Sequence, residues 1–358
     1  MRGTLPIQRT NWLNTQEATY HLCRSSFSSK TSNTCQNEIA VTMSTSSCSI
    51  PIIDVDRIGL HRKSQDIDRD VLEDVGSKMK DALSKFGVCY FKNHGIDQDF
   101  IEKYLSVAED FFKQANETKM QYVRGSVWQF GYYPCEHENL NTERPGDLKE
   151  SFNYHPADDQ ADWTNIEFHR GCKELFALCK KFGNTVLDAL SVGLGLKQSF
   201  LRDSHKYIGQ MDNLSALRTL YYPPIPLDVS IKLDQVRLGE HSDYGTVSLL
   251  FQDEVGGLEV NVPGKGLIPV TPIPGTIVIL AGDLLQRWTS GSLFALKHMV
   301  HLPEEESKKR NPRQSAVFFI MPDNDCLVKP LDGSEMYPSV RCIDHVNAKL
   351  KPRAGVTY

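Results

Sequence analysis

The sequence predicts an α+β fold, in which a helical N-terminal half precedes a β-rich C-terminal half that forms a sandwich or jelly roll. Apolar residues recur at steps of three and four up to about residue 193, which is typical of amphipathic helices. After Leu214 the pattern changes to short β-branched and aromatic runs separated by Gly, Pro and Asp, which is typical of strands and turns. The chain of 358 residues, 40% of them hydrophobic, is long enough for a main core with added layers.

The N-terminal half contains five expected elements. Its first helix is predicted to end at Gly87, and Asp97 is a suitable N-cap for the next one. Residues 124–163 are rich in Gly, Pro, aromatic and charged residues, and they predict loops and short strands only. In chain order we expect a strand at 49–58, a helix at 66–87, a strand and turn at 88–95, a helix at 97–112 and a helix at 165–193.

The C-terminal half contains five expected strands. They read “SALRTLYYPP”, “GTVSLLFQ”, “GLEVNV”, “TIVILAG” and “SAVFFIM”. We therefore expect three regions along the chain: a tail or leader at 1–48, a mostly helical domain at 49–205 and a jelly-roll domain at 206–358.

Composition and charge argue against several classes of protein. A formal net charge of −5 and a pI of about 6.1 do not suit a nucleic-acid partner, which needs a clustered basic face. No apolar run approaches the ~18 residues that cross a bilayer, so no membrane partner is expected. The nine cysteines are scattered without a C-x-x-C pair, which predicts free thiols in a reducing compartment. We expect a cytoplasmic monomer that binds a small molecule.

The first 48 residues are rich in Ser, Thr, Asn and Gln and poor in acidic residues. They contain no apolar core of a secretory signal. A disordered tail, or a start of translation at Met43, is the main expectation. A mitochondrial leader within residues 1–42 is the alternative.

The motif “HSD” places His241 and Asp243 at the start of an apolar run. Residues at i and i+2 of an extended chain point to the same side. His298 lies on another strand-like segment, 55 residues after Asp243. Two histidines and one carboxylate form the facial triad of non-haem Fe(II) sites, which leaves positions open; Mn, Co or Ni could substitute. Zinc more often takes a closed shell or a third histidine, and the chain lacks the His-Glu-x-x-His helix of zinc hydrolases.

A third motif, “RQS”, opens the strand-like run that follows. Arg313 and Ser315 would offer a planar guanidinium and a hydroxyl on one face, which suits a carboxylate. Each motif alone has an ordinary explanation, because His-x-Asp is common in surface turns, His298 could be structural and Arg313 could form a surface ion pair. The hypothesis rests on their order and spacing together. His301, three residues after His298, is expected to face the other side of the strand.

In this order the motifs resemble the isopenicillin-N-synthase-like branch of the Fe(II)/2-oxoglutarate-dependent dioxygenases. The resemblance extends from about Ile50 to Phe319 and includes “IPIIDV”, “FGVCYFKNHGI”, “DLKESF”, “LRTLYYPPIP”, “GEHSDYGTVSLLFQD”, “GDLLQRWTSG” and “RQS”. It implies a distorted double-stranded β-helix, or jelly roll, with an N-terminal helical layer packed around it.

The resemblance also implies a chemistry. Fe(II) would be bound by His241, Asp243 and His298, and 2-oxoglutarate by Arg313, Ser315 and Tyr222. O2 is the second cosubstrate. The family reaction decarboxylates 2-oxoglutarate to succinate and CO2 while a small organic substrate is hydroxylated, desaturated or cyclised.

The chain departs from the family at positions close to these motifs. Leu220 and Leu280 stand where Asn is frequent, Met299 where Arg is usual, and Ala295-Leu296 where Ser-Thr is usual. Neighbours of this kind orient ligands and tune a metal. Two alternatives therefore stay open: a same-fold Fe(II) oxidase that does not use 2-oxoglutarate, and a non-catalytic iron or metabolite sensor.

Aromatic residues are the candidates for a substrate pocket. The segment “WQFGYYP” begins at Trp128, and further aromatic residues follow at Phe152, Tyr154, Phe318 and Phe319. Each of them is expected either to line the pocket or to pack in the core.

Overall fold

The computed structural model describes residues 49–123, 130–138, 144–158, 163, 165–226, 230–303, 305 and 309–350. The tail or leader expected at 1–48, with Met43, lies outside these residues. Residues from Cys48 onward belong to one compact unit. No helix in the described ranges combines the length and apolarity needed to cross a membrane.

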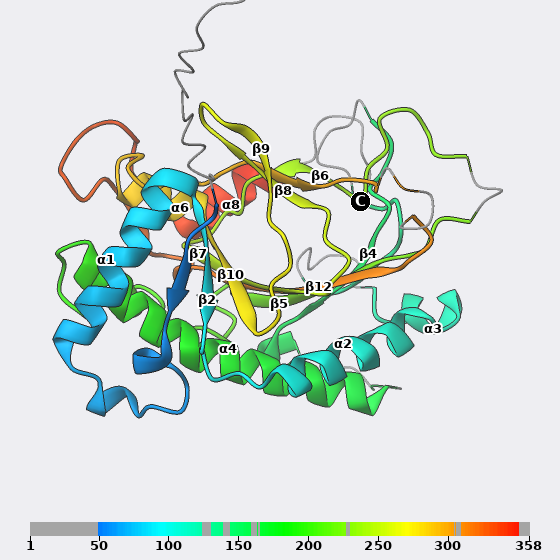
Figure 1. Ribbon diagram of the computed structural model, residues 1–358, viewed down its shortest axis with the longest axis horizontal. Coiled ribbons are helices and arrows are strands. Elements are labelled where there is room, and N and C mark those ends of the chain that lie inside the picture. The colour runs from blue at the N-terminus through cyan, green and yellow to red at the C-terminus, as the bar shows by residue number, and fades with distance from the viewer. Residues whose placement is uncertain are drawn as a thin grey trace, which may run out of the picture. The chain divides into compact units, whose positions relative to one another are not determined.

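Two sheets form the jelly roll, and Figure 1 shows them as two layers. The larger sheet contains, in spatial order, β1 (Ile52–Asp54), β2 (Val88–Lys92), β10 (Thr276–Ala281), β7 (Val247–Gln252), β12 (Arg313–Ile320), β5 (Ala216–Tyr222), β4 (Glu150–Tyr154) and β3 (Gly131–Tyr133). The smaller sheet contains β6 (Leu238–His241), β11 (His298–Val300), β8 (Leu258–Val262) and β9 (Gly266–Pro269). A separate pair is formed by β13 (Leu327–Val328) and β14 (Val340–Arg341). The five strands expected in the C-terminal half are confirmed as β5, β7, β8, β10 and β12.

Alternation along the strands divides side chains between the space enclosed by the two sheets and the outer core. Leu220 and Tyr222 of β5 and Val317 of β12 belong to a cluster shared with Leu258 of β8. Their sequence neighbours on the strands, such as Phe318, belong to the cluster that also contains helix residues. Since side chains two apart share a face, the inner face of β12 carries Arg313, Ser315, Val317 and Phe319.

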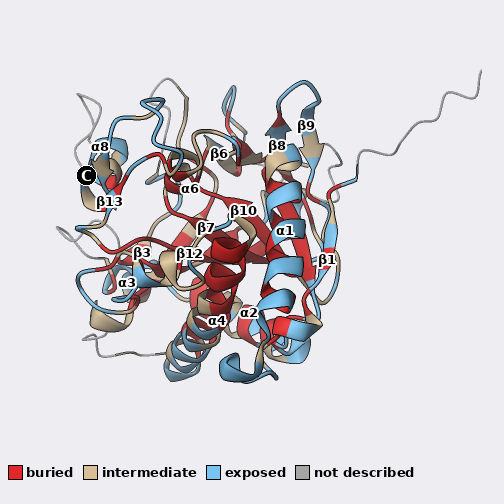
Figure 2. Ribbon diagram, turned by 90° about the vertical axis from the view of Figure 1, so that its left-hand side faces the viewer, coloured by how far each residue is buried: buried red, intermediate tan, exposed pale blue. Residues whose placement is uncertain are grey.

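Three long helices contribute to the outer core. They are α1 (Arg69–Phe86), α2 (Gln98–Phe112) and α4 (Ile166–Gly193), with α1 packed on α4 and both α2 and α4 in contact with β5 and β12. Figure 2 shows that buried residues concentrate in the second half of α4 and in β7, β10 and β12. The three expected helices are confirmed with starts shifted by up to three residues. Gly87 ends α1 with a left-handed φ of 61°, and the Asp97 carboxylate accepts from the Asp99 amide at the start of α2.

The N-terminal half also supplies strands to the larger sheet. The strand expected at 49–58 is shorter than predicted, because β1 covers Ile52–Asp54 and a 3-10 turn follows at Asp56–Ile58. β1 and β2 extend one edge of the sheet, and β3 and β4 extend the other. The remaining α-helices of the described chain are α3 (Asn116–Met120), α5 (Phe200–Asp203), α6 (Asp283–Trp288) and α8 (Cys342–Leu350).

Candidate active site

The predicted triad comes together at one end of the smaller sheet. His241 ends β6, His298 begins β11, and the two residues are paired in register. Asp243 follows β6, and its Oδ1 lies 3.9 Å from His241 Nε2 and 3.7 Å from His298 Nε2. All three residues can present one ligand atom within 4.8 Å of the others. This spacing suits a single metal ion held from one side.

Hydrogen bonds orient each of the three side chains. Nδ1 of His241 lies 2.9 Å from the Gly239 carbonyl, and Nδ1 of His298 lies 3.2 Å from the Leu296 carbonyl. A proton on Nδ1 leaves the Nε2 lone pair for a metal. Ser248 donates to Asp243 Oδ2 at 2.6 Å, which leaves Oδ1 on the metal side. Burial, with His298 as the next cause, lowers the pKa of His241 well below its ordinary value, so the ring is neutral, as ligation requires.

His301 does not join the triad. It follows β11, is partly exposed, and its Nε2 lies 2.9 Å from Glu259 Oε2. His301 is therefore not among the described residues that converge on Asp243.

The Arg-x-Ser motif lies on the inner face of β12, where Arg313 is paired in register with Tyr222. The Cζ atom of Arg313 lies 4.8 Å from the centroid of the Tyr222 ring, and Nη1 donates to Ser315 Oγ at 3.3 Å. Nε donates to the Gly256 carbonyl at 2.7 Å, and Nη2 to Gln252 Oε1 at 3.2 Å. Arg313, Ser315 and Tyr222 are all buried. The structure thus brings together the three residues predicted for the cosubstrate.

A cavity of about 190 Å³ opens beside His241 and Asp243. Its lining contains a charged group of side chains, called here the charged wall, and a mainly apolar group, called the apolar wall. The charged wall contains Glu138, Asp147, Lys149 and Arg218, and the apolar wall includes Leu214, Tyr244, Phe319, Val346 and Leu350.

The aromatic candidates divide between this cavity and the core. Phe319 and Tyr133 line the cavity. Phe152, Tyr154 and Phe318 instead pack in the outer core, so these three do not line the pocket, because their strand positions face the helices. Trp128 lies outside the described residues.

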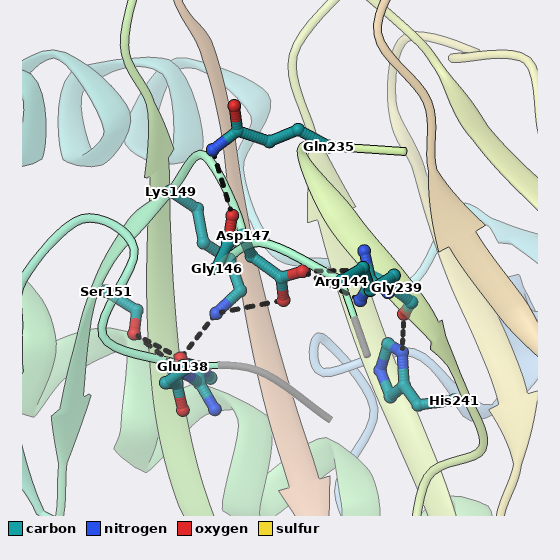
Figure 3. A network of polar contacts seen from close by, with 10 residues as sticks. Glu138, Arg144, Gly146, Asp147, Lys149, Ser151, Gln235, Gly239 and His241 are labelled. Carbon is teal, nitrogen blue, oxygen red and sulfur yellow. Dashed lines mark hydrogen bonds and ion pairs between the residues drawn. The ribbon is translucent and has the colours of Figure 1, made fainter. Parts of the chain in front are cut away.

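The residues of the charged wall are linked by hydrogen bonds and ion pairs, which Figure 3 shows. Glu138 accepts from both Lys149 and Arg218, and Lys149 also lies 3.8 Å from Asp147. Arg144 and the Gly239 amide both donate to Asp147 Oδ1 at 3.1 Å. Burial acts to raise the pKa of Glu138, but the two cations outweigh it and bring the pKa to about 2. No pattern in the sequence indicated a role for these residues, although Asp147 and Lys149 lie in “DLKESF”.

The C-terminal helix α8 lines the cavity through Val346 and Leu350. Asp283 holds this helix: its Oδ2 lies 3.3 Å from His345 Nε2 and 2.6 Å from Lys349 Nζ. The Asp283 amide donates to the Asp243 carbonyl at 2.8 Å. One residue therefore connects the helix that lines the cavity with the loop that carries Asp243. No sequence motif had indicated this helix.

The positions that depart from the family do not disturb this geometry. Leu220 and Leu280 are buried in the cluster between the sheets, so apolar side chains fill these sites. Met299 alternates with His298 on β11 and is less buried than its neighbours. The Ala295 amide donates to Gln286 Oε1 at 2.8 Å.

A jelly roll that carries both a two-histidine, one-carboxylate triad and a buried Arg-x-Ser motif defines a class, the mononuclear non-haem metal oxygenases. Residues 50–177 match the family profile for the non-haem dioxygenase in morphine synthesis N-terminal region, and residues 213–322 match that for the 2OG-Fe(II) oxygenase superfamily.

Individual relatives point the same way. The “2-oxoglutarate-dependent dioxygenase htyE” of Aspergillus rugulosus is 32% identical over 305 residues, covering 75% of this chain and 88% of the relative. Another, gloF of Glarea lozoyensis, is 33% identical over 295 residues, with 75% and 88% covered. A full-length Neurospora crassa protein, crystallised in complex with alpha-KG, has a TM-score of 0.72 and 27% identity, covering 84% of this chain and 95% of that one.

The chain belongs to the 2OG-Fe(II) oxygenase superfamily. It is an oxidoreductase of the 2-oxoglutarate- and Fe(II)-dependent dioxygenase type, which uses O2 as the further cosubstrate.

Proposed function

We propose that His241, Asp243 and His298 bind the Fe(II) ion, and that the far carboxylate of 2-oxoglutarate binds between Arg313, Ser315 and Tyr222. The observation that carries this proposal is the convergence of the Nε2 atoms of both histidines on Asp243 Oδ1. The donor set fits Fe(II), since it combines neutral imidazole with one carboxylate and leaves a face open. When bound, iron and 2-oxoglutarate supply an oxidant, derived from O2, for a C–H bond of the substrate.

The protein's own residues hold and orient the reactants. Gly239 and Leu296 fix the histidine rings through their carbonyls, and Ser248 fixes Asp243. Arg313 offers a charged planar donor to a carboxylate, and its contacts with Gly256 and Gln252 hold its orientation. These hydrogen bonds hold the side chains in place before binding, so less conformational entropy is lost when the reactants bind.

The substrate that we propose is a small organic molecule with a polar side and an apolar side. The cavity beside the triad supports this class, because its lining combines the charged wall of Lys149, Arg218, Glu138 and Asp147 with apolar residues of β12 and α8. Hydroxylation, desaturation or ring closure of such a molecule is the expected outcome.

We also propose a division of the chain into two domains. Residues 49–205 would form the mostly helical layer around the core, and residues 206–358 the jelly-roll domain with the iron site. We propose a monomer in the cytoplasm; the described cysteines, which are free thiols, support a reducing compartment.

Anaerobic calorimetry of 2-oxoglutarate binding to the Fe(II)-loaded protein tests the assignment. Wild type should bind it saturably and only with iron, and Arg313→Ala should weaken binding while iron stays bound. His298→Ala should lose iron, whereas His301→Ala, the matched control three residues away, should keep it. Iron retention without 2-oxoglutarate binding would contradict the cosubstrate site. Iron retention in His298→Ala would contradict the metal site.

A further inference from the structure

Arg237, the residue before β6, is a buried arginine whose charge is not paired. Its exposed fraction is 1%. Nη2 donates to the Asn311 carbonyl at 2.9 Å. Nε and Nη1 are buried and donate to no atom of the chain as described. Because a guanidinium stays charged and a buried charge without a hydrogen-bonded counter-ion is costly, these two nitrogens are suited to bind an anion.

The strand pairings place Arg237 at the same end of the jelly roll as Arg313. The next residue, Leu238, pairs with Val300, and Val300 pairs with Leu258 of β8. Gly256, two residues before Leu258, accepts the Nε hydrogen bond of Arg313. Asn311, which accepts from Arg237, stands two residues before Arg313. Both arginines thus meet around the first residues of β12.

The carboxylate of Asp253 interacts electrostatically with both arginines, but one carboxylate does not balance two cations. Its Oδ1 and Oδ2 already accept from the Val255 and Gln314 amides. Burial, and then the charge of Arg313, lower the pKa of Arg237. The buried cluster between the two sheets, which includes Leu220, Leu258 and Val300, is apolar and offers no counter-charge.

We propose that Arg237 is a second guanidinium for the distal carboxylate of the 2-oxo acid, and that with Arg313 it makes a dicarboxylic acid the required cosubstrate. The inference rests on the proposed function, because it places that carboxylate beside Arg313. Arg313 already donates to Gly256, Ser315 and Gln252. Arg237 keeps two nitrogens for a new acceptor, and a carboxylate is the acceptor that guanidinium groups bind most strongly.

The test compares two 2-oxo acids of equal length, 2-oxoglutarate and 2-oxopentanoate, which has a methyl group in place of the distal carboxylate. Both are titrated anaerobically into the Fe(II)-loaded full chain. In Arg237→Met, the 2-oxoglutarate affinity should fall about 10- to 100-fold, as expected for lost charged hydrogen bonds. The 2-oxopentanoate affinity should stay within about twofold. Arg237→Lys keeps the charge and should recover part of the loss.

Arg202→Met is the matched control, because this change also removes one arginine charge. Arg202 lies on α5, is half-exposed and forms an ion pair with Asp188 of α4. Arg202→Met should leave both affinities unchanged. Thermal unfolding gives a second readout. Removing an unpaired buried charge should not lower the unfolding midpoint of the ligand-free protein, whereas the extra stability conferred by 2-oxoglutarate should shrink.

An equal loss for both acids in Arg237→Met would overturn the proposal, because it would indicate a structural role. Unchanged 2-oxoglutarate binding would overturn it as well. Wild-type protein that holds iron and binds neither acid would refute the proposed function, and the inference with it. This outcome can be told apart from failure of the inference alone, because it is observed in the wild-type titration.

Discussion

Glu138→Gln should destabilise the protein more than any exposed carboxylate change of the same chemistry. The Glu138 side chain is 25% exposed and accepts from Lys149 and Arg218, whose side chains are 3% and 19% exposed. Ser151 donates to the same oxygen at 3.4 Å. Glutamine keeps the shape but leaves two buried cations without their shared carboxylate.

The magnitude follows from the pKa of Glu138. Burial favours the neutral carboxyl, but Arg218 and Lys149 outweigh it and lower the pKa from 4.5 to about 2. At about 1.36 kcal/mol per pH unit, this difference corresponds to about 3 kcal/mol of folding free energy at pH 7. Because part of the carboxylate meets solvent, screening reduces the expected loss in the glutamine variant to about 2–3 kcal/mol.

Urea unfolding at several pH values measures this loss. Since the folded pKa lies below the unfolded one, the contribution is complete above about pH 4.5 and disappears as the pH falls toward 2. The difference between wild type and variant should therefore be constant from pH 8 to about 6 and shrink below about pH 4.5. Glu167→Gln is the control, because its pair with Arg170 is exposed on α4 and should contribute less than about 1 kcal/mol. Equal stability of wild type and Glu138→Gln at pH 7, or a difference that grows in acid, would refute the reasoning.

Three further predictions concern the metal, the cosubstrate and the C-terminal helix. His241→Ala should abolish iron-dependent succinate formation, because two remaining ligands hold Fe(II) poorly; measurable turnover at the wild-type rate would contradict the triad. Arg313→Ala should raise the 2-oxoglutarate concentration for half-maximal decarboxylation about 10-fold or more, since it removes a charge-assisted contact; an unchanged requirement would refute its role. Asp283→Asn should weaken the ion pairs to His345 and Lys349, so hydrogen exchange in α8 should accelerate while β12 stays protected; unchanged exchange in α8 would show that apolar packing alone holds it.

The triad and the Arg-x-Ser motif could be predicted from the sequence because local geometry carries them. His241 and Asp243, like Arg313 and Ser315, are two residues apart, and an extended chain turns such pairs to one side. The pairing of His298 with His241 is not local, but the resemblance to a known family supplied it. The sequence was therefore sufficient to predict positions whose neighbours lie on the same strand or follow from a recognised order of motifs.

The charged wall could not be predicted, because it depends on contacts across the sheet. Glu138 follows β3 and Arg218 lies on β5, 80 residues later, and the two meet because β4 pairs with both β3 and β5. A charged residue in a sequence is by default expected on the surface. Arg237 shows the same limit: it begins the run “RLGEHSDYG”, yet nothing in that run indicates that its guanidinium is buried.

Two groups of charges inside the jelly roll differ in how they are balanced. Beside the cavity, Lys149 and Arg218 share Glu138, and Asp147 also lies close to Lys149. This group keeps its counter-ions in the ligand-free protein, so it does not depend on an added anion. Beside Arg313, Asp253 interacts with two arginines and has both oxygens engaged by backbone amides. We therefore expect a dianionic cosubstrate to gain most by placing its far carboxylate between these arginines, which leaves the cavity for the molecule that is oxidised.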